Sequence, residues 1–260
     1  MELNEQLTFD DPDREDLYNV VERQGQVTEA EARRVLNLDP TAFGHHLTVL
    51  RRDGYIRKVG EELQIAQPAD ERDVHAIDNE VVVVRAADED DREALESVIG
   101  TVAREGTYIE AETVAAALDY DGAVTRHNDV MSRLFFVAEV MDEDGEDGEL
   151  VGWVHLDLPE AEKLSHTAQL TVGLLSEYRG KGIGRLLLAR GVRWAREHGY
   201  EKLYNSVPAT NERAIRFLTD HGWETEAVRE GHYRIDGEYV DETMLAVDPR
   251  EVEAEDDADA

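Results

Sequence analysis

The 260-residue sequence contains no cysteine, which excludes disulfide bonds, thiolate metal sites and a cysteine nucleophile. It also contains no apolar run close to the roughly 20 residues that a membrane helix needs. Residues 1–11 lack the basic region and the apolar core of a secretion signal. These absences predict a cytoplasmic protein without a membrane anchor.

Positive charge is also scarce. The chain has 27 Lys and Arg against 60 Asp and Glu, a formal net charge of -33, and four of its residues are lysine. Such self-repulsion is typical of disordered chains or of proteins adapted to high salt, where screening shortens its range. The apolar fraction of 41% argues against disorder and leaves room for two domains. The composition resembles that of proteins from extreme halophiles, so the acidity indicates the solvent and says little about partners.

The most informative stretch is Tyr178–Arg185, which reads Y-R-G-K-G-I-G-R. It follows an apolar run, Thr167–Leu175, and opens an amphipathic segment, which predicts a strand, a glycine loop and a helix start. The first N–H groups of a helix lack intrahelical partners and its dipole adds positive potential, so phosphate is the natural ligand. A tight turn packed against a sheet is the alternative. The predicted phosphate-binding residues are Arg179, Gly180, Lys181, Gly182, Ile183, Gly184 and Arg185.

Two other phosphate-binding motifs fail on their spacing. A P-loop needs G-x-x-x-x-G-K-[S/T], whereas Lys181 is followed by glycine. A dinucleotide fingerprint follows the first strand of an α/β domain, whereas this loop follows the middle of a sheet.

Residues 1–67 predict a small separate domain. Apolar spacing and capping signals predict helices over 13–24, 28–38 and 39–54, and strands over 55–59 and 62–66. This order, with the V-T-E-A-E turn and the L-R-R-D-G-Y-I ending, resembles the winged helix-turn-helix domains of prokaryotic transcription regulators.

A locally basic segment suggests what this domain binds. From Thr41 to Gly60 four cations face one acid, as backbone binding to nucleic acid requires. The alternatives are a solvated helix end and a docking surface for the neighbouring domain or a second subunit. No metal-spaced group is evident beside the two histidines. The nucleic-acid candidates are Thr41, His45, His46, Arg51, Arg52, Arg57 and Lys58.

Residues 68–79 are polar and aperiodic, which predicts a linker, and residues 249–260 predict a disordered acidic tail. Between them the sequence predicts one domain over residues 80–248. Its expected strands are 81–84, 134–141, 150–158, 167–175, 202–207, 223–228 and 239–247, and its expected helices are 94–102, 113–118, 183–198 and 211–221.

This second domain resembles the GNAT superfamily of acetyl-CoA-dependent N-acetyltransferases. Three stretches carry the resemblance: V-V-V-V-R-A-A-D-E-D-D from Val81, the glycine loop, and N-E-R-A-I-R-F-L-T-D-H-G-W from Asn211. The loop matches R-x-x-G-x-G/A, and the third stretch matches N-x-x-A-x-x-F-Y-x-x-x-G-F/W. The resemblance implies an α+β fold, with a mixed central sheet and flanking helices, that binds acetyl-CoA.

The resemblance also implies positions for the cofactor. Backbone groups of Leu174 and Leu175 would hold its pantetheine arm on a splayed strand, and the Leu174 amide would polarise the thioester carbonyl. Loop amides would bind the pyrophosphate, and Asn211, Ala214 and Phe217 would line the far side.

Two departures leave the catalytic groups open. The family's tyrosine acid is replaced by Leu218, and the strand glutamate of histone-type members by Ala168. Replacement bases could come from the strands that flank the cleft, and activity could also run through ordered water alone. The candidate bases are Glu139, His155, Asp157 and His166, and the candidate acids are Tyr204, Tyr233 and Tyr239.

The sequence therefore predicts an enzyme that transfers acetyl from acetyl-CoA to a primary amine. The acceptor would be a protein N-terminus, a lysine, an amino acid or a small amine. The alternative is a DNA-binding regulator whose second domain senses acetyl-CoA or a metabolite. A third reading uses the first domain to deliver the enzyme to a protein, and a homodimer is compatible with each.

Overall fold

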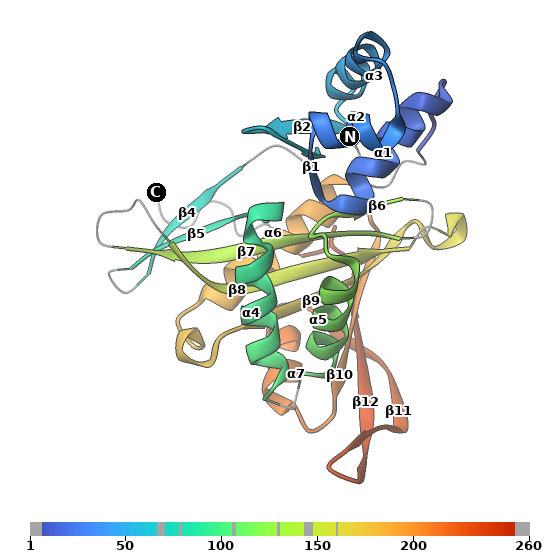
Figure 1. Cartoon of the computed structure of the whole chain (residues 1–260). Coiled ribbons are helices and arrows are strands. Elements are labelled where there is room, and N and C mark those ends of the chain that lie inside the picture. The colour runs from blue at the N-terminus through green and yellow to red at the C-terminus, as the bar shows by residue number, and fades with distance from the viewer. Residues whose placement is uncertain are drawn as a thin grey trace.

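The structure, a computed structural model, describes residues 7–66, 71–77, 80–105, 108–128, 131–142, 148–159 and 161–252 (Figure 1). A large mixed sheet organises most of the chain. The β9–β10 pair is parallel and every other pair given for this sheet is antiparallel, which confirms the predicted mixed α+β sheet. In spatial order its strands are β11 (Glu224–Ile235), β12 (Glu238–Val247), β10 (Lys202–Pro208), β9 (Thr167–Leu174), β8 (Gly148–Leu158), β7 (Ser132–Met141), β5 (Glu80–Ala86) and β4 (Asp73–Ile77), and β6 (Arg126–His127) pairs with β7.

Helices cover both faces of this sheet. In Figure 1, α4 (Arg92–Ala103) and α5 (Ile109–Asp121) lie in front of the sheet and α6 (Ile183–Glu197) lies behind it. Because successive side chains of a strand point to opposite faces, Phe135 packs in the core under α4 and α5, and Phe136 packs in the core under α6. The remaining helices here are α7 (Glu212–Asp220) and the short 3₁₀ helices η1 (Glu89–Asp91), η2 (Glu162–Leu164) and η3 (Ser176–Tyr178).

The N-terminal part has its own small core. Thr28 and Glu31 form a capping box, in which the Glu31 amide lies 3.2 Å from Thr28 Oγ1. Leu17, Phe43, Leu50 and Leu63 are among the buried side chains of this core. Its elements are α1 (Pro12–Gln24), β1 (Gln26–Thr28), α2 (Glu29–Leu36), α3 (Pro40–Arg52), β2 (Ile56–Val59) and β3 (Glu62–Ile65), with the strands in the order β1-β3-β2.

Buried polar contacts join the N-terminal part to the rest of the chain near β6. The Tyr18 hydroxyl donates to the His127 carbonyl at 2.9 Å, and Arg126 Nη1 donates to the Glu22 carbonyl at 2.6 Å. Glu22, only 3% exposed, also accepts from Asn128 Nδ2 at 2.6 Å. The two parts therefore share a desolvated interface.

Gly25, which ends α1, lies in this interface. Its φ is +71°, and a Cβ placed there would lie 2.7 Å from Glu89 Oε2 and 2.9 Å from Ala123 Cβ. Only glycine can combine this backbone conformation with so close an approach.

The structure differs from the sequence expectation in several elements, among them β6, which was not expected, and β11, which is longer than the predicted 223–228. Residues 73–77, expected within a linker, form β4, which pairs with β5. Each β4 side chain is at least partly exposed, so this edge strand lacks the apolar pattern that identifies a buried one. The strand β1 was not expected, and α5 is longer than the predicted 113–118. Residue 67, other parts of the linker (68–70, 78–79), the β7–β8 turn (143–147) and the tail from 253 lie outside the described residues.

Candidate active site

The sheet opens between β9 and β10. These strands pair only over Thr167–Gln169 and Lys202–Tyr204. Just beyond, Asn205 Nδ2 donates to the Leu170 carbonyl at 2.6 Å, in place of the strand partner that is missing there. Beyond that bond, the edge of β9 that faces away from β8 is open.

The register with β8 shows which β9 groups face this opening. The Leu175 amide donates to the Val151 carbonyl of β8 at 2.9 Å. In an antiparallel pair the N–H groups of successive residues point to opposite sides, so the Leu174 amide points away from β8 and into the opening. The Leu174 carbonyl accepts from Arg179 Nε at 2.9 Å.

A cavity of about 400 Å³ occupies the opening. One wall is the open edge of β9, and the opposite wall is β10 with α7. The glycine loop and the start of α5 also contribute. Its lining includes Thr171–Leu174, Arg179, Gly180, Gly182, Gly184, Arg185, Asn205–Pro208, Asn211, Arg213, Ala214, Phe217, Leu218 and Tyr108–Ala111.

The glycine loop presents backbone amides at the start of α6. Gly182 is the N-cap residue, with a φ of +96°, and it has no side chain to accept from the first amides of the helix. A Cβ added at Gly180 or Gly182 would meet nothing within 4 Å, so the space beside the loop is open. Amides arranged in this way can bind an anion.

Two of the three loop cations are engaged elsewhere. Arg179 makes a bidentate ion pair with Glu105, at 2.7 and 2.8 Å, and its guanidinium lies 5.1 Å from the Tyr108 ring centroid. Lys181 lies 3.1 Å from Glu80. In this structure both side chains hold the loop to neighbouring elements. Arg179 also lines the cavity, as do Arg185 and Arg213.

Three predicted cofactor residues do not line the cavity: Leu175, Lys181 and Ile183. Leu175 packs in the core under α4 and α5, and Ile183 packs in the core under α6. The others, Leu174, Arg179, Gly180, Gly182, Gly184, Arg185, Asn211, Ala214 and Phe217, do line it.

A carboxylate lies at the α5 end of the cavity. Glu110 lines it and accepts from Gln169 Nε2 at 2.8 Å. Burial raises the pKa of the Glu110 carboxyl, and the charges of Glu242 and Asp157 act in the same direction, whereas the Gln169 bond opposes them. A carboxylate with a raised pKa is better suited to accept a proton near neutral pH.

Thr171 lies in the same wall. It is 6% exposed, and its hydroxyl has no hydrogen-bond partner among the residues that the structure describes. A buried hydroxyl that lines a cavity and lacks a partner is a ready donor or acceptor for a bound molecule.

The side chains predicted as bases lie elsewhere. Glu139 is held by Arg85, at 3.1 Å from Nε, and does not line the cavity. His166 is exposed on the turn before β9. His155 is buried against Phe135, and burial with the nearby Arg133 charge lowers its pKa to about 3. The structure therefore places Glu139, His155 and His166 outside the cavity lining.

Asp157 also does not line the cavity, but it influences groups near it. Its charge raises the pKa of Glu110 and of the Tyr204 phenol, whose pKa is raised chiefly by burial. Burial raises the pKa of Asp157 itself, although its residue surface is largely accessible. Of the candidate acids, Tyr233 donates to Glu242 at 3.1 Å, and Tyr239 is 75% exposed.

Some nucleic-acid candidates are exposed and others are not. Thr41, His45, Arg51 and Arg52 are exposed on α3, although Arg52 pairs with Asp53 at 2.7 Å. His46 is 7% exposed and faces α1, so its prediction as a nucleic-acid contact is wrong in this structure. The partly exposed residues are Arg57, which donates to Gln64 at 3.1 Å, and Lys58, which pairs with Glu29 at 2.8 Å.

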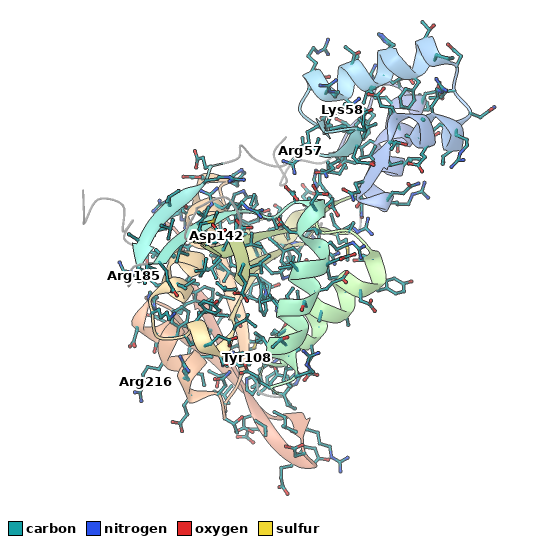
Figure 2. All side chains as sticks on the ribbon, turned by 60° about the vertical axis from the view of Figure 1, so that its left-hand side comes forward. Arg57, Lys58, Tyr108, Asp142, Arg185 and Arg216 are labelled. Atoms are coloured by element: carbon teal, nitrogen blue, oxygen red, sulfur yellow. The ribbon has the colours of Figure 1, made fainter. Side chains whose placement is uncertain are left out.

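Figure 2 places Arg57 and Lys58 in the N-terminal part, whereas Arg185 and Arg216 lie at the other end of the molecule. Any basic surface of the N-terminal part is thus separate from the cavity.

Sequence reasoning missed several cavity residues. The sequence did not predict Tyr108, Thr171, Asn205 and Arg213. None of them belongs to a recognisable motif, and they come together only in the cavity where β9 and β10 separate. The one available signal was the amide of Asn205 next to the apolar residues of its strand, among them Leu203 and Val207.

No curated protein matches the chain. Several solved structures share its fold, and all three described here are too distant to show more than that. A GNAT-family acetyltransferase from Streptococcus pneumoniae is 20% identical, with a TM-score of 0.51, over 64% of this chain and 98% of that chain. The Streptococcus mutans protein smu.2055 is 18% identical, with a TM-score of 0.51, over 64% and 98%. YncA from Salmonella typhimurium, solved with its cofactor acetyl-CoA, is 20% identical, with a TM-score of 0.50, over 68% and 98%.

A family model is more decisive, because it covers most of the chain. The model described as the acetyltransferase (GNAT) family matches residues 60–223, which include both walls of the cavity and the glycine loop. The chain therefore belongs to the GNAT acetyltransferase family and is an acyltransferase that uses acetyl-CoA.

Proposed function

We propose that this enzyme transfers the acetyl group to a positively charged primary amine by direct attack. One observation carries the proposal: a single cavity joins the amides of the glycine loop to the half-buried carboxylate of Glu110. The loop amides suit a pyrophosphate, and the Glu110 carboxylate suits an ammonium group that must lose a proton.

The cavity walls would hold the cofactor along its length. The loop amides, with Arg185 and Arg213, would bind the pyrophosphate, and the open edge of β9 at Leu174 would bind the pantetheine arm. Asn211, Ala214 and Phe217 of α7 would contact the opposite side. The bound cofactor supplies the acetyl group as a thioester.

Glu110 would be the base. It would take a proton from the ammonium, after which the neutral amine forms a bond to the thioester carbonyl carbon. The carbon–sulfur bond then breaks, and the amide nitrogen loses its second proton to solvent. The Leu174 amide would stabilise the carbonyl oxygen as negative charge develops on it. Leu218 occupies the family's tyrosine position, so we assign the proton for the leaving thiolate to solvent.

Charge supports a cationic acceptor. Asp157 and Glu242 lie close enough to Glu110 that their negative charges raise the pKa of its carboxyl. An acceptor with a second cationic group would relieve this repulsion, whereas an acidic amine would increase it. The unpartnered Thr171 hydroxyl adds a polar contact in the same wall.

A thiol-release assay tests this proposal. It should compare an aliphatic diamine, a neutral monoamine and an acidic amino acid at molar salt, because the composition resembles that of halophilic proteins. We expect the order diamine, monoamine, acidic amine in kcat/KM. Equal rates for all three would contradict the cationic acceptor, and no release with any amine would contradict an amine acceptor altogether.

A second role in DNA binding has its own support. We propose that the N-terminal part is a winged helix-turn-helix domain that uses the exposed face of α3, with Thr41, His45 and Arg51. This face is opposite the buried residues Phe43, Leu47 and Leu50 of the same helix. A mobility-shift assay with genomic fragments should use the full chain, since Tyr18 and Glu22 would be uncovered in a fragment. A mobility shift of the DNA that Arg51→Glu does not weaken would contradict this role.

A further inference from the structure

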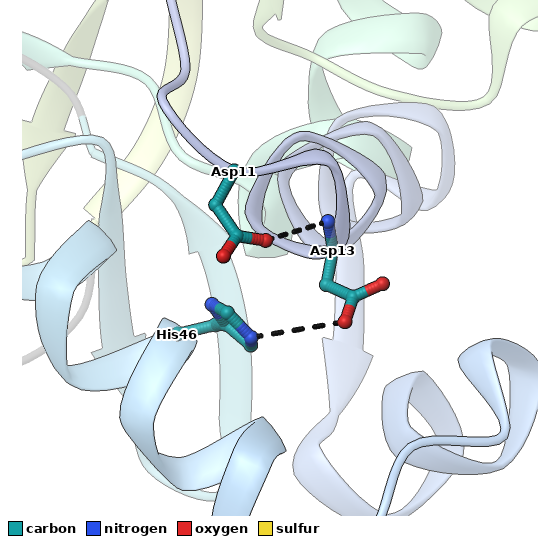
Figure 3. Close-up of side chains that lie close together, drawn as sticks. All are labelled: Asp11, Asp13 and His46. Atoms are coloured by element: carbon teal, nitrogen blue, oxygen red, sulfur yellow. Dashed lines mark hydrogen bonds and ion pairs between the residues drawn. The ribbon is translucent and has the colours of Figure 1, made fainter.

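Three potential metal ligands converge in the N-terminal part, far from the acetyl-CoA cavity. Asp11 and Asp13 lie at the start of α1, and His46 lies in the middle of α3 (Figure 3). One ligand atom of each residue lies within 4.8 Å of the other two. The ligands thus come from two helices that are neighbours in space and more than thirty residues apart in sequence.

His46 is the unusual member of this cluster, because it is buried without a hydrogen bond. The residue is 7% exposed, and no group in the described part of the chain bonds to its Nδ1. Its Nε2 points to Asp13 Oδ2 at 3.9 Å, which is too long for a hydrogen bond (Figure 3). A buried imidazole usually has a partner, so this ring is aimed at the carboxylates and left unsatisfied.

The carboxylates retain free oxygens toward the ring. Asp11 uses Oδ1 to accept from the Asp13 amide at 3.0 Å, as the N-cap of α1. Its other oxygen, like Oδ2 of Asp13, is available for a ligand. A metal ion bonded at about 2.0–2.2 Å to nitrogen and oxygen ligands separates them from one another by about 3–4 Å. The His46–Asp13 separation of 3.9 Å falls in that range.

We propose that Asp11, Asp13 and His46 bind one divalent transition-metal ion, with Zn²⁺ the best-suited. The imidazole nitrogen favours Zn²⁺ over Mg²⁺ and Ca²⁺, which prefer oxygen ligands alone. Three protein ligands would leave room for water in the remaining position. Bound metal would connect the start of α1 to α3, the helix that bears Thr41 and His45 on its exposed face.

Two features limit the affinity of the site. A metal-bound histidine usually donates its second N–H to a protein acceptor, and Nδ1 of His46 has no such acceptor among the described residues. The positive end of the α1 dipole also opposes a cation. We therefore expect binding weaker than that of a zinc-finger site, where the metal drives folding.

Calorimetric titration of the full chain with Zn²⁺, in molar KCl with excess Mg²⁺, tests the proposal. The Mg²⁺ occupies diffuse sites on a chain whose net charge is -33. We expect one saturable equivalent of Zn²⁺. His46→Gln and Asp13→Asn each remove one proposed ligand, and each should weaken Zn²⁺ binding at least about tenfold. Even a change in a residue that only hydrogen-bonds to a ligand usually weakens metal binding by about that factor. The control Asp16→Asn, on an exposed residue of the same helix, should bind as the parent does.

Titration with Co²⁺ gives a second readout, because its visible absorption changes in position and intensity when protein ligands replace water, which diffuse binding does not cause. Circular dichroism shows whether each variant folds. If buried His46→Gln does not fold, Asp13→Asn decides, since the Asp13 side chain is 54% exposed. Zn²⁺ binding that survives both ligand changes, or no saturable binding by the parent, would overturn the proposal in favour of a metal-free contact between His46 and the aspartates.

Discussion

Asn205 Nδ2 lies 2.6 Å from the Leu170 carbonyl oxygen, at the point where β9 and β10 stop pairing. This bond satisfies a carbonyl group that would otherwise be buried without a partner at the edge of the cavity. The opening in the sheet therefore leaves no buried carbonyl unpaired at this point, and this depends on the amide side chain of Asn205.

Replacement of Asn205 by leucine should destabilise the protein by about 1–3 kcal/mol, the cost of one buried carbonyl without a hydrogen bond. Denaturant unfolding of the full chain measures this. Asn19→Leu is the control, because Asn19 is half-buried on α1 and no described group bonds to its side chain. Equal losses in the two variants would show that the Leu170 carbonyl does not need this donor.

Gly182→Glu should abolish acetyl-CoA binding in calorimetry at high salt. The φ of +96° disfavours a side chain, and a carboxylate beside the loop amides would repel a pyrophosphate. Gly199→Glu is a matched control, because Gly199 has a φ of +78°, equally open space around its Cβ position, and no place in the cavity lining. Unchanged affinity in Gly182→Glu would remove the loop from the cofactor site.

Glu110→Gln should lower kcat/KM by about 10²–10⁴-fold, the usual contribution of a general base. The base works ionised, so parental activity should fall as the pH drops through the Glu110 pKa, which burial raises above its ordinary value of about 4.3. The variant should lose this acidic limb of the pH profile. Glu112→Gln, on an exposed residue of the same helix, should keep it. An identical profile in Glu110→Gln would assign the limb to another group.

Glu22→Ala should cost about 3 kcal/mol in the free energy of unfolding, because it leaves Arg126 buried with less compensating charge and removes the bond from Asn128. Glu96→Ala breaks the more exposed Arg92–Glu96 pair, an i,i+4 contact worth about 0.3–0.5 kcal/mol. Denaturant unfolding of both variants gives the comparison. A difference under about 1 kcal/mol would mean that water reaches the interface.

The parts of the fold that the sequence predicts best carry a local signal. Thr28 and Glu31 have the spacing of a capping box, and the glycines of the loop come directly before an amphipathic segment, which marks the start of a helix. Strand β4 has no such signal, since Val74 is 65% exposed on an edge strand.

The site was harder to predict, because its groups meet only after folding. Glu139 looked available on a strand beside the cleft, but its partner Arg85 is 54 residues away in sequence. Glu110, Asp157 and Glu242 likewise come from three separate elements, and their mutual effect on one pKa follows from the way in which the sheet folds.

The close approach at Gly25 limits how this protein can be recombined. A Cβ there would collide with Glu89 and Ala123, which belong to the enzyme part, while the same glycine ends the first helix of the N-terminal part. Neither part can therefore be replaced independently of the other. A chimera that exchanges either part must carry the matching half of this contact, so the interface is inherited as a unit.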